Sequence, residues 1–149
     1  MRLRPAIIVL SALGVALAAY LTYIHYADLK PFCVSGSGGC EKVQTSAPSK
    51  LAGVPVAVLG LVGYTAILVT SLARSEAART AAAFLALAGF GFSAYLTYEE
   101  LFVIHAVCQW CVASAILMTL LAALTTTRLL TDDPASQPVL RGSLVPSSP

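Results

Sequence analysis

Charged residues are scarce in this chain, and they are absent from four long stretches of it. Asp, Glu, Lys and Arg make up 11% of the 149 residues, whereas hydrophobic residues make up 58%; soluble domains have about 25% and about 45–50%. The uncharged stretches are residues 5–27, 51–73, 80–98 and 101–127. A helix on the surface of a soluble protein needs a polar face, and these stretches have almost none. The composition therefore excludes a soluble globular domain.

Each uncharged stretch is close to or above the roughly 20 residues that cross a bilayer as a helix. We therefore predict an all-α membrane protein, a bundle of four transmembrane helices within residues 1–130, because backbone polar groups in lipid must be satisfied within each helix. Residues 131–149 are rich in Pro, Ser and Asp, which predicts a disordered cytoplasmic tail. Arg2, Arg4 and the apolar run behind them also resemble a signal peptide, but the run extends to Tyr26, which is too long for one.

Arginine is restricted to one side of the predicted bundle. It precedes the first stretch, lies between the second and third, and follows the fourth, at positions 2, 4, 74, 79, 128 and 141. The three Lys residues lie between the first and second stretches. Glu99 and Glu100 lie between the third and fourth, where we expect them to form a solvated loop face. Basic residues favour the cytoplasmic side, so both termini are predicted to be inside and these two loops outside.

Cysteine is absent except at four positions, all in the predicted outer region. Cys108 and Cys111 are three residues apart, so on a helix they share one face and lie within reach of a disulfide. If the fourth helix begins near His105 or Ala106, both cysteines lie in its first turn, where unpaired N–H groups favour an anion and lower a thiol pKa. Because disulfides persist outside such a membrane, the pair predicts thiol–disulfide chemistry beside a lipid-soluble electron acceptor.

The other two cysteines, Cys33 and Cys40, bracket the sequence Val-Ser-Gly-Ser-Gly-Gly. These small residues let the loop close into a disulfide and also move, so that the pair could visit both an outside protein and the dithiol of the fourth helix. A permanent staple of the loop is the alternative. Residues 41–52 predict a short helix or turn on the bundle mouth, because apolar residues recur there every four positions. Gly53 and Pro55 are expected to start the second long helix.

Two other interpretations of the cysteines stay open on these grounds. Both pairs could be structural disulfides of a non-catalytic membrane scaffold, although a bridge across Cys-x-x-Cys closes a loop too short for much stabilisation. The four could bind zinc, but Cys-x6-Cys exceeds the usual ligand spacing, so no metal is expected. His25 and His105, near outer helix ends, are candidates for proton relay. Trp110 and most tyrosines gather toward the outer side, as in an aromatic belt, and no nucleic-acid motif is present.

Taken together, these motifs resemble the vitamin K epoxide reductase family, in its bacterial branch. The matching features are the loop pair Cys33 and Cys40, the segment CEKV with Ser46 six residues after Cys40, the segment KLAGVPVAVLGLVGY from Lys50, and CQWCVAS from Cys108. The resemblance implies a four-helix bundle around a quinone, capped by the first outer loop, in the inner (cytoplasmic) membrane of a bacterial cell. It implies that electrons pass from a thioredoxin-like protein through the loop pair to the Cys-x-x-Cys pair, and then to the quinone.

The resemblance also assigns a role to individual residues. Cys33 is expected to face the protein partner, Cys40 to exchange disulfides with Cys108, and Cys111 to face the quinone. Ser46 matches a family serine near the catalytic mouth.

The expected quinone site departs from the animal enzymes at two positions. Val56 and Ala115 stand where those enzymes carry an Asn and a Tyr, and neither can donate a side-chain hydrogen bond. This favours plain reduction of ubiquinone or menaquinone over reduction of vitamin K epoxide. Because the chain ends at Pro149, soon after the fourth stretch, we expect a separate thioredoxin-like partner. The unrelated DsbB family does the same chemistry, but its quinone-proximal Cys-x-x-Cys lies in the first outer loop, which this chain does not match.

Overall fold

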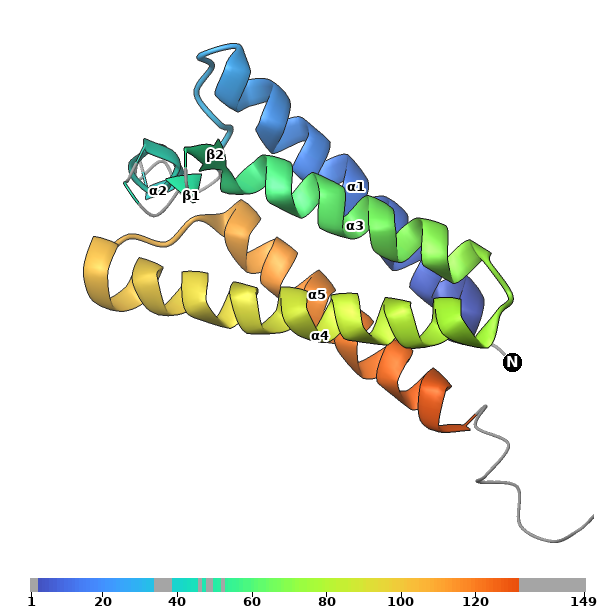
Figure 1. Cartoon of the computed structure of the whole chain (residues 1–149). Helices are drawn as coiled ribbons and strands as arrows, with labels where there is room; N and C mark the ends of the chain where they lie inside the picture. The colour runs from blue at the N-terminus through green and yellow to red at the C-terminus, as the bar shows by residue number, and fades with distance from the viewer. Residues whose placement is uncertain (1–2, 34–38, 46, 48–49, 52, 132–149) are drawn as a thin grey trace, which may run out of the picture.

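Four long helices form the body of the protein (Figure 1). This computed structural model describes residues 3–33, 39–45, 47, 50–51 and 53–131. The long helices are α1 (Leu3–Tyr26), α3 (Val56–Leu72), α4 (Glu76–Tyr98) and α5 (Gln109–Thr131). Helix α1 packs against α3 and α5, and α4 packs against the same two helices. The predicted helical bundle is confirmed, although its last helix begins at Gln109 and not near His105 or Ala106.

Three of these helices are long and apolar enough to cross a membrane. They are α1, α5, and α4 with its extension to Ile104, and their mean hydropathies are 2.2, 1.7 and 1.5. Helix α3 is apolar but shorter, with 17 residues. Large apolar side chains such as Val9, Val62, Phe84 and Ile116 are exposed. So much exposed apolar surface suits lipid and not water.

A small cap covers the end of the bundle away from the N-terminus (Figure 1). It consists of helix α2 (Gly39–Thr45) and an antiparallel hairpin of β1 (Lys50–Leu51) and β2 (Val54–Pro55). Gly53, in the hairpin turn, has a φ of 85°, a conformation that glycine adopts without strain. The short helix predicted over residues 41–52 therefore ends earlier, at Thr45, because the hairpin takes up the last residues of that segment.

Helix α3 begins directly after the hairpin. Pro55 ends β2 and is the N-cap residue of α3, a place where a missing backbone N–H costs nothing. The prediction that Pro55 starts this helix is confirmed. The uncharged stretch begins earlier, at residue 51, but Leu51 pairs with Val54 in the hairpin and does not belong to the helix.

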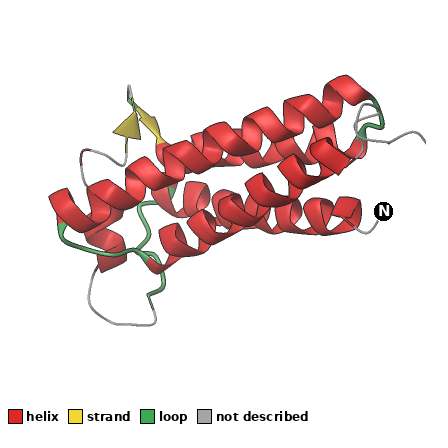
Figure 2. Cartoon of the chain, turned by 90° about the horizontal axis from the view of Figure 1, so that it is seen from below, coloured by secondary structure: helices red, strands yellow, loops and turns green. Residues whose placement is uncertain are grey.

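The opposite end of the bundle carries the basic residues. Arg4 donates hydrogen bonds to the carbonyl oxygens of Ser71 (3.3 Å) and Leu72 (2.6 Å), the last residues of α3. Ser75 then caps α4 by accepting a hydrogen bond from the Ala78 N–H at 3.2 Å. In a second view (Figure 2) the N-terminus again lies at the end of the bundle away from the hairpin. The arginines of α1 and α4 thus lie far from the cap.

We predicted that the third long helix ends at Tyr98, but α4 runs on beyond that residue. It continues through a π-helical turn, η2 (Glu99–Ile104), and the chain turns away only at His105, which has a left-handed φ of 52°. No Gly or Pro occurs between residues 92 and 104, so nothing in the local sequence ends the helix earlier. The solvated loop predicted at Glu99 and Glu100 is therefore wrong, and Glu100 is only 5% exposed.

The core between the helices is built around Tyr64 of α3. Its buried members are Ile7, Ala18, Tyr64, Ile67, Ala86, Met118, Leu121 and Ala122. Gly14 of α1 lies against the Tyr64 ring, and a Cβ atom at this position would overlap the ring. The Tyr64 hydroxyl lies 2.9 Å from both the carbonyl and the hydroxyl oxygen of Ser114 in α5. Tyr64 therefore joins α3 to α5 directly below the cap.

Candidate active site: a dithiol between an outer disulfide and an apolar cavity

The outer cysteine pair, Cys33 and Cys40, forms a disulfide with its Cα atoms 6.4 Å apart. Cys40 lies in the first turn of α2 and is 2% exposed, whereas Cys33 is only partly buried. The prediction that the loop closes into a disulfide is confirmed. One sulfur of this bridge is thus reachable from outside, and the other faces the interior.

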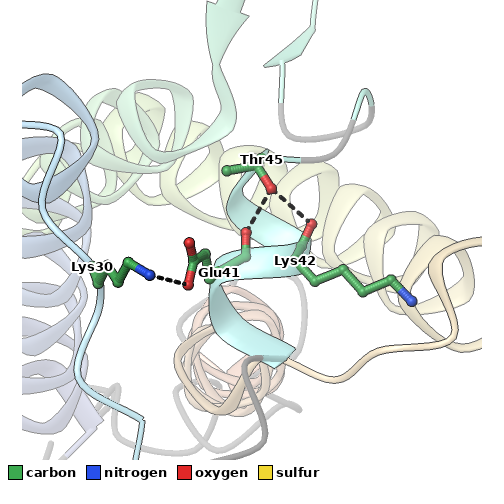
Figure 3. Close-up of polar contacts among 4 residues, drawn as sticks. All are labelled: Lys30, Glu41, Lys42 and Thr45. Atoms are coloured by element: carbon green, nitrogen blue, oxygen red, sulfur yellow. Dashed lines mark hydrogen bonds and ion pairs between the residues drawn. The ribbon is translucent and has the colours of Figure 1, made fainter.

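Helix α2 is tied to the segment that follows α1. Lys30 and Glu41 form an ion pair at 3.2 Å, and the Thr45 hydroxyl donates to the carbonyl oxygens of Glu41 (2.8 Å) and Lys42 (3.4 Å) (Figure 3). The Lys30 and Glu41 side chains are 79% and 48% exposed. Such an ion pair contributes at most about 1 kcal/mol, so it locates α2 on the bundle without being a main source of stability.

The inner pair begins α5, and Cys108 occupies its N-cap position. The Val112 N–H donates to the Cys108 carbonyl oxygen at 3.0 Å, which is the first bond of the helix. The backbone N–H groups of Trp110 and Cys111 stabilise the Cys108 thiolate, as they would stabilise an N-cap side-chain oxygen. Both inner cysteines are free thiols. The helix starts later than the predicted position, His105 or Ala106, but both cysteines still lie at its first turn.

This arrangement lowers the pKa of the Cys108 thiol from 9.0 to about 7. The hydrogen bond from the Cys111 thiol is the main cause, and the two backbone N–H groups add to it. Burial and the negative charge of Glu100 act in the opposite direction. Because the thiolate is the reactive form, Cys108 becomes ready for disulfide exchange at a lower pH than an ordinary cysteine.

Cys40 and Cys108 are brought together under the cap. They form one buried cluster with Val43, and Cys33 and Cys111 pack against its edge. Cys108 is fully buried, at 0% exposed. Cys40 and Cys108 are 68 residues apart in the sequence. The two pairs nevertheless share one sulfur-rich cluster, as an exchange of disulfides between them requires.

Two hydrogen bonds fasten the outer loop to the Cys-x-x-Cys turn. The Trp110 Nε1–H donates to the Phe32 carbonyl oxygen at 2.8 Å, and the Gln109 side-chain amide donates to the same oxygen at 3.2 Å. Phe32 directly precedes Cys33. The Trp110 ring also packs on Tyr20 of α1, with ring centroids 5.2 Å apart. Trp110 thus links the position of the loop disulfide to the helix that carries the inner dithiol.

Replacing Trp110 by phenylalanine should loosen this link while keeping an aromatic ring against Tyr20. A hydrogen bond is worth about 1 kcal/mol, which corresponds to about fivefold in an equilibrium. We therefore expect a small phosphine to reduce the Cys33–Cys40 disulfide about fivefold faster, as followed by maleimide labelling over time. Tyr20→Phe is the matched control and should react at the wild-type rate. Equal acceleration in both variants would mean that loss of the Trp110 hydrogen bond is not what frees the loop.

A cavity of about 370 Å³ lies on the other side of the inner pair. Cys111 lines it, together with apolar side chains from all four long helices, such as Leu17, Leu21, Ile67, Leu85, Phe92 and Met118. Tyr64 and Ser114 also reach it, already bonded to each other. Its volume lies within the range of about 300–1,000 Å³ for small-molecule pockets. The few polar groups and the apolar walls suit the ring and first tail carbons of a quinone.

Glu100 is the residue of this site that the sequence did not reveal. Its Oε2 atom accepts a hydrogen bond from the Cys108 N–H at 3.3 Å, its carboxylate lies beside the Cys111 thiol, and it lines the cavity. Only the π-helical turn brings it there, because a simple loop at this point would expose it. The only sequence signal available was a carboxylate eight residues before Cys108, inside a long apolar run.

The other predicted site residues divide into three groups. Val56 and Ala115 both line the cavity. Ser46 lies outside the described residues, as do residues 132–149 of the predicted tail. Neither His25 nor His105 is among the residues that line the cavity.

Among the residues that the structure describes, no group of three or more His, Cys, Asp or Glu side chains could hold a metal ion.

The model of the vitamin K epoxide reductase family matches residues 5–126 of the chain, a span that contains both cysteine pairs, the cap and the cavity.

Proposed function

The chain belongs to the vitamin K epoxide reductase family, and we propose that it oxidises the dithiol of a thioredoxin-like protein and passes the electrons to a membrane quinone. The family is one of thiol–disulfide oxidoreductases, so the general type of reaction follows from membership. The partner, the acceptor and the order of the cysteines form the proposal. Its main support is that Cys108 is buried against Cys40 on one side while Cys111 lines the cavity on the other.

The electrons enter at the outer pair. A partner thiolate attacks the sulfur of Cys33, the more exposed cysteine, and a mixed disulfide forms while Cys40 leaves as a thiolate. The second partner thiol then releases Cys33, and the partner departs with a disulfide. Cys40, buried beside Cys108, attacks the Cys108–Cys111 disulfide at Cys108, and Cys111 leaves. Cys33 resolves this second mixed disulfide, which restores the Cys33–Cys40 bridge and leaves both inner cysteines reduced.

The last stage of the inward transfer would leave the four cysteines paired as follows. The outer pair is a disulfide, and Cys108 and Cys111 are thiols. A quinone bound in the cavity would accept two electrons and two protons. Cys111 is the thiol that contacts that space, and Cys108, with its pKa of about 7, supplies the thiolate that closes the inner disulfide. The apolar walls exclude water from the exchange.

We also propose that all four long helices cross the membrane. Helix α3 has 17 residues, which span about 25 Å at about 1.5 Å per residue and lie at the lower end of the usual range of about 17–25 residues. Arg4, Arg74, Arg79 and Arg128 belong to the helix ends away from the cap. The excess of basic residues at that end favours a cytoplasmic location for it. The cysteines and the cap would then face the outside of a bacterial inner membrane.

A trapping experiment tests the contact on which the proposal rests. In the double variant Cys33→Ala/Cys111→Ala only Cys40 and Cys108 remain, and mild oxidation should join them in a disulfide. Protection from a maleimide of high mass, reversed by reductant, would detect it. The matched variant Cys40→Ala/Cys108→Ala keeps one outer and one inner cysteine, Cys33 and Cys111, and should form little disulfide. Equal or greater protection in the matched variant would contradict the proposed order of exchange.

A further inference from the structure

One buried group of the site has no part in the electron path described so far. The Glu100 carboxylate is 5% exposed, and an ionised carboxylate away from water is costly unless it is compensated. Within the described part of the chain no Lys or Arg forms an ion pair with it. Its compensation comes instead from the inner cysteine pair: the Cys108 N–H donates a hydrogen bond to it at 3.3 Å, and the neighbouring Cys111 thiol also stabilises its charged form.

The backbone holds this carboxylate in place. Glu100 lies in the π-helical turn η2, and its carbonyl oxygen accepts the Ala106 N–H at 3.1 Å. The chain then reverses through the left-handed residue His105 and returns Cys108 above the Glu100 side chain. The Cys108 N–H, at 3.3 Å, orients the carboxylate. The backbone of the turn therefore places the carboxylate beside the thiols, and this placement does not depend on one conformation of a flexible side chain.

The thiol hydrogen of Cys111 faces two acceptors. One is the sulfur of Cys108, and the other is the carboxylate of Glu100. The Cys111 sulfur must lose this hydrogen before it can join Cys108 in a disulfide, and Cys108 cannot both keep the proton and act as the attacking thiolate. Glu100 is the acceptor that leaves both sulfurs free to react.

We propose that Glu100 is a catalytic proton carrier, which takes the proton from the Cys111 thiol and delivers it into the cavity to the reduced acceptor. This inference rests on the proposed function. In sum, the Cys108 thiolate and the Cys111 thiol lose two electrons and one proton as their sulfur–sulfur bond forms. The quinone takes up both electrons, that proton and a second proton from water. Glu100 gains and then loses one proton, so it returns to its starting state.

The neighbouring titratable groups are less suited to this task. Glu99 lines the cavity but is bonded to Tyr95, and the Tyr64 hydroxyl is already bonded to Ser114. On α2, which packs against η2, Glu41 and Lys42 are exposed, as is His105 at the end of η2. Among the described carboxyl groups, Glu100 is the one in contact with Cys111.

The test compares Glu100→Gln, Glu100→Asp and Glu99→Gln in the full-length protein. The glutamine at 100 still accepts the Cys108 N–H but cannot carry the proton. General acid–base catalysis contributes about 10²–10⁴-fold, so quinone reduction by pre-reduced protein should fall by about a hundredfold or more. The aspartate should recover part of the rate. Glu99→Gln, at a second carboxyl group of the same cavity, should lose far less activity than Glu100→Gln, and an equal loss would overturn the inference.

A second readout separates proton transfer from thiol activation, and it needs no quinone. The Glu100 charge opposes ionisation of Cys108, so the thiolate absorbance of reduced Glu100→Gln should appear at lower pH than in wild type, with a Cys108 pKa below about 7. We expect Glu100→Gln to form more Cys108 thiolate than wild type and yet to reduce quinone more slowly. Slow reduction with the thiolate appearing at higher pH would overturn the inference, since Glu100 would then only position the thiols.

The outcomes also separate this inference from the proposed function. If wild type reduces quinone and Glu100→Gln does so within about threefold, the proton role is wrong and the electron path stands. If wild type does not reduce quinone at all, the proposed function fails, and the Glu100 inference fails with it. Should Glu100→Gln not fold, as judged by absence of the Cys33–Cys40 disulfide, the Glu100→Asp variant decides: a wild-type rate across the pH range would overturn the inference.

Discussion

Replacement of Cys111 by serine should abolish quinone reduction and leave the outer disulfide in place. Cys111 is the only cysteine of the described residues that lines the cavity, and a serine there cannot form the inner disulfide. Removing the reacting group of a covalent pathway costs on the order of a thousandfold or more. Quinone absorbance, with reduced protein and with a reducing partner, measures the loss.

The same variant should also keep its outer bridge. Cys108 can attack that bridge at Cys40, but Cys33 then displaces Cys108 again, because no Cys111 is present to close the inner disulfide. Peptide mapping by mass spectrometry should therefore find the Cys33–Cys40 disulfide and a free Cys108 thiol. Val112→Ser is a suitable control, because it introduces the same side chain one position away at an exposed site, and it should turn over normally. Normal turnover of Cys111→Ser would contradict the assignment of the inner pair.

Replacement of Cys33 by alanine should separate two reductants. A thioredoxin-like protein is too large to reach the buried Cys40 or Cys108, at 2% and 0% exposed, so its oxidation should fall by on the order of a hundredfold once the ordered exchange path is lost. Dithiothreitol is small enough to reduce the inner pair directly, and quinone reduction driven by it should change little. The two rates are measured on the same preparation by quinone absorbance.

The comparison of the reductants supplies its own control for folding, because a misfolded variant would lose both activities. Phe32→Leu, one position earlier, keeps the carbonyl oxygen that accepts from Trp110 and should retain both activities. Equal loss with protein and small-molecule reductants in Cys33→Ala would remove the shuttle role given to the outer pair.

Local features of this site were predictable from the sequence because they depend on short spacings. Cys33 and Cys40 close a loop of small residues, and Cys108 and Cys111 meet in one helical turn whichever residue starts the helix. The Pro55 start of α3 follows in the same way from the chemistry of proline. Val56 and Ala115 both line the cavity, and no spacing or periodicity in the sequence would have paired them.

Features that depend on the path of the chain were not predictable. Glu99 and Glu100 have the composition of a solvated loop, and only the continuation of α4 through η2 buries Glu100. The burial is made tolerable by partners far along the chain, since its carboxylate accepts a hydrogen bond from the Cys108 N–H and lies beside the Cys111 thiol. Likewise, the periodicity of residues 41–52 indicated a helix, but pairing of Lys50 and Leu51 in the hairpin prevailed over it, since tertiary context outweighs local preference.

The most direct test of the proposed function couples the two half-reactions. Purified protein in detergent is mixed with a reduced thioredoxin-like protein and either ubiquinone or menaquinone, and quinone loss and partner disulfide are measured together. We predict one quinone reduced for each partner disulfide formed, with no reaction when Cys108 or Cys111 is replaced by alanine. Four cysteines that the partner cannot reduce, with no loss of either quinone, would contradict the proposal and indicate a membrane scaffold with structural disulfides.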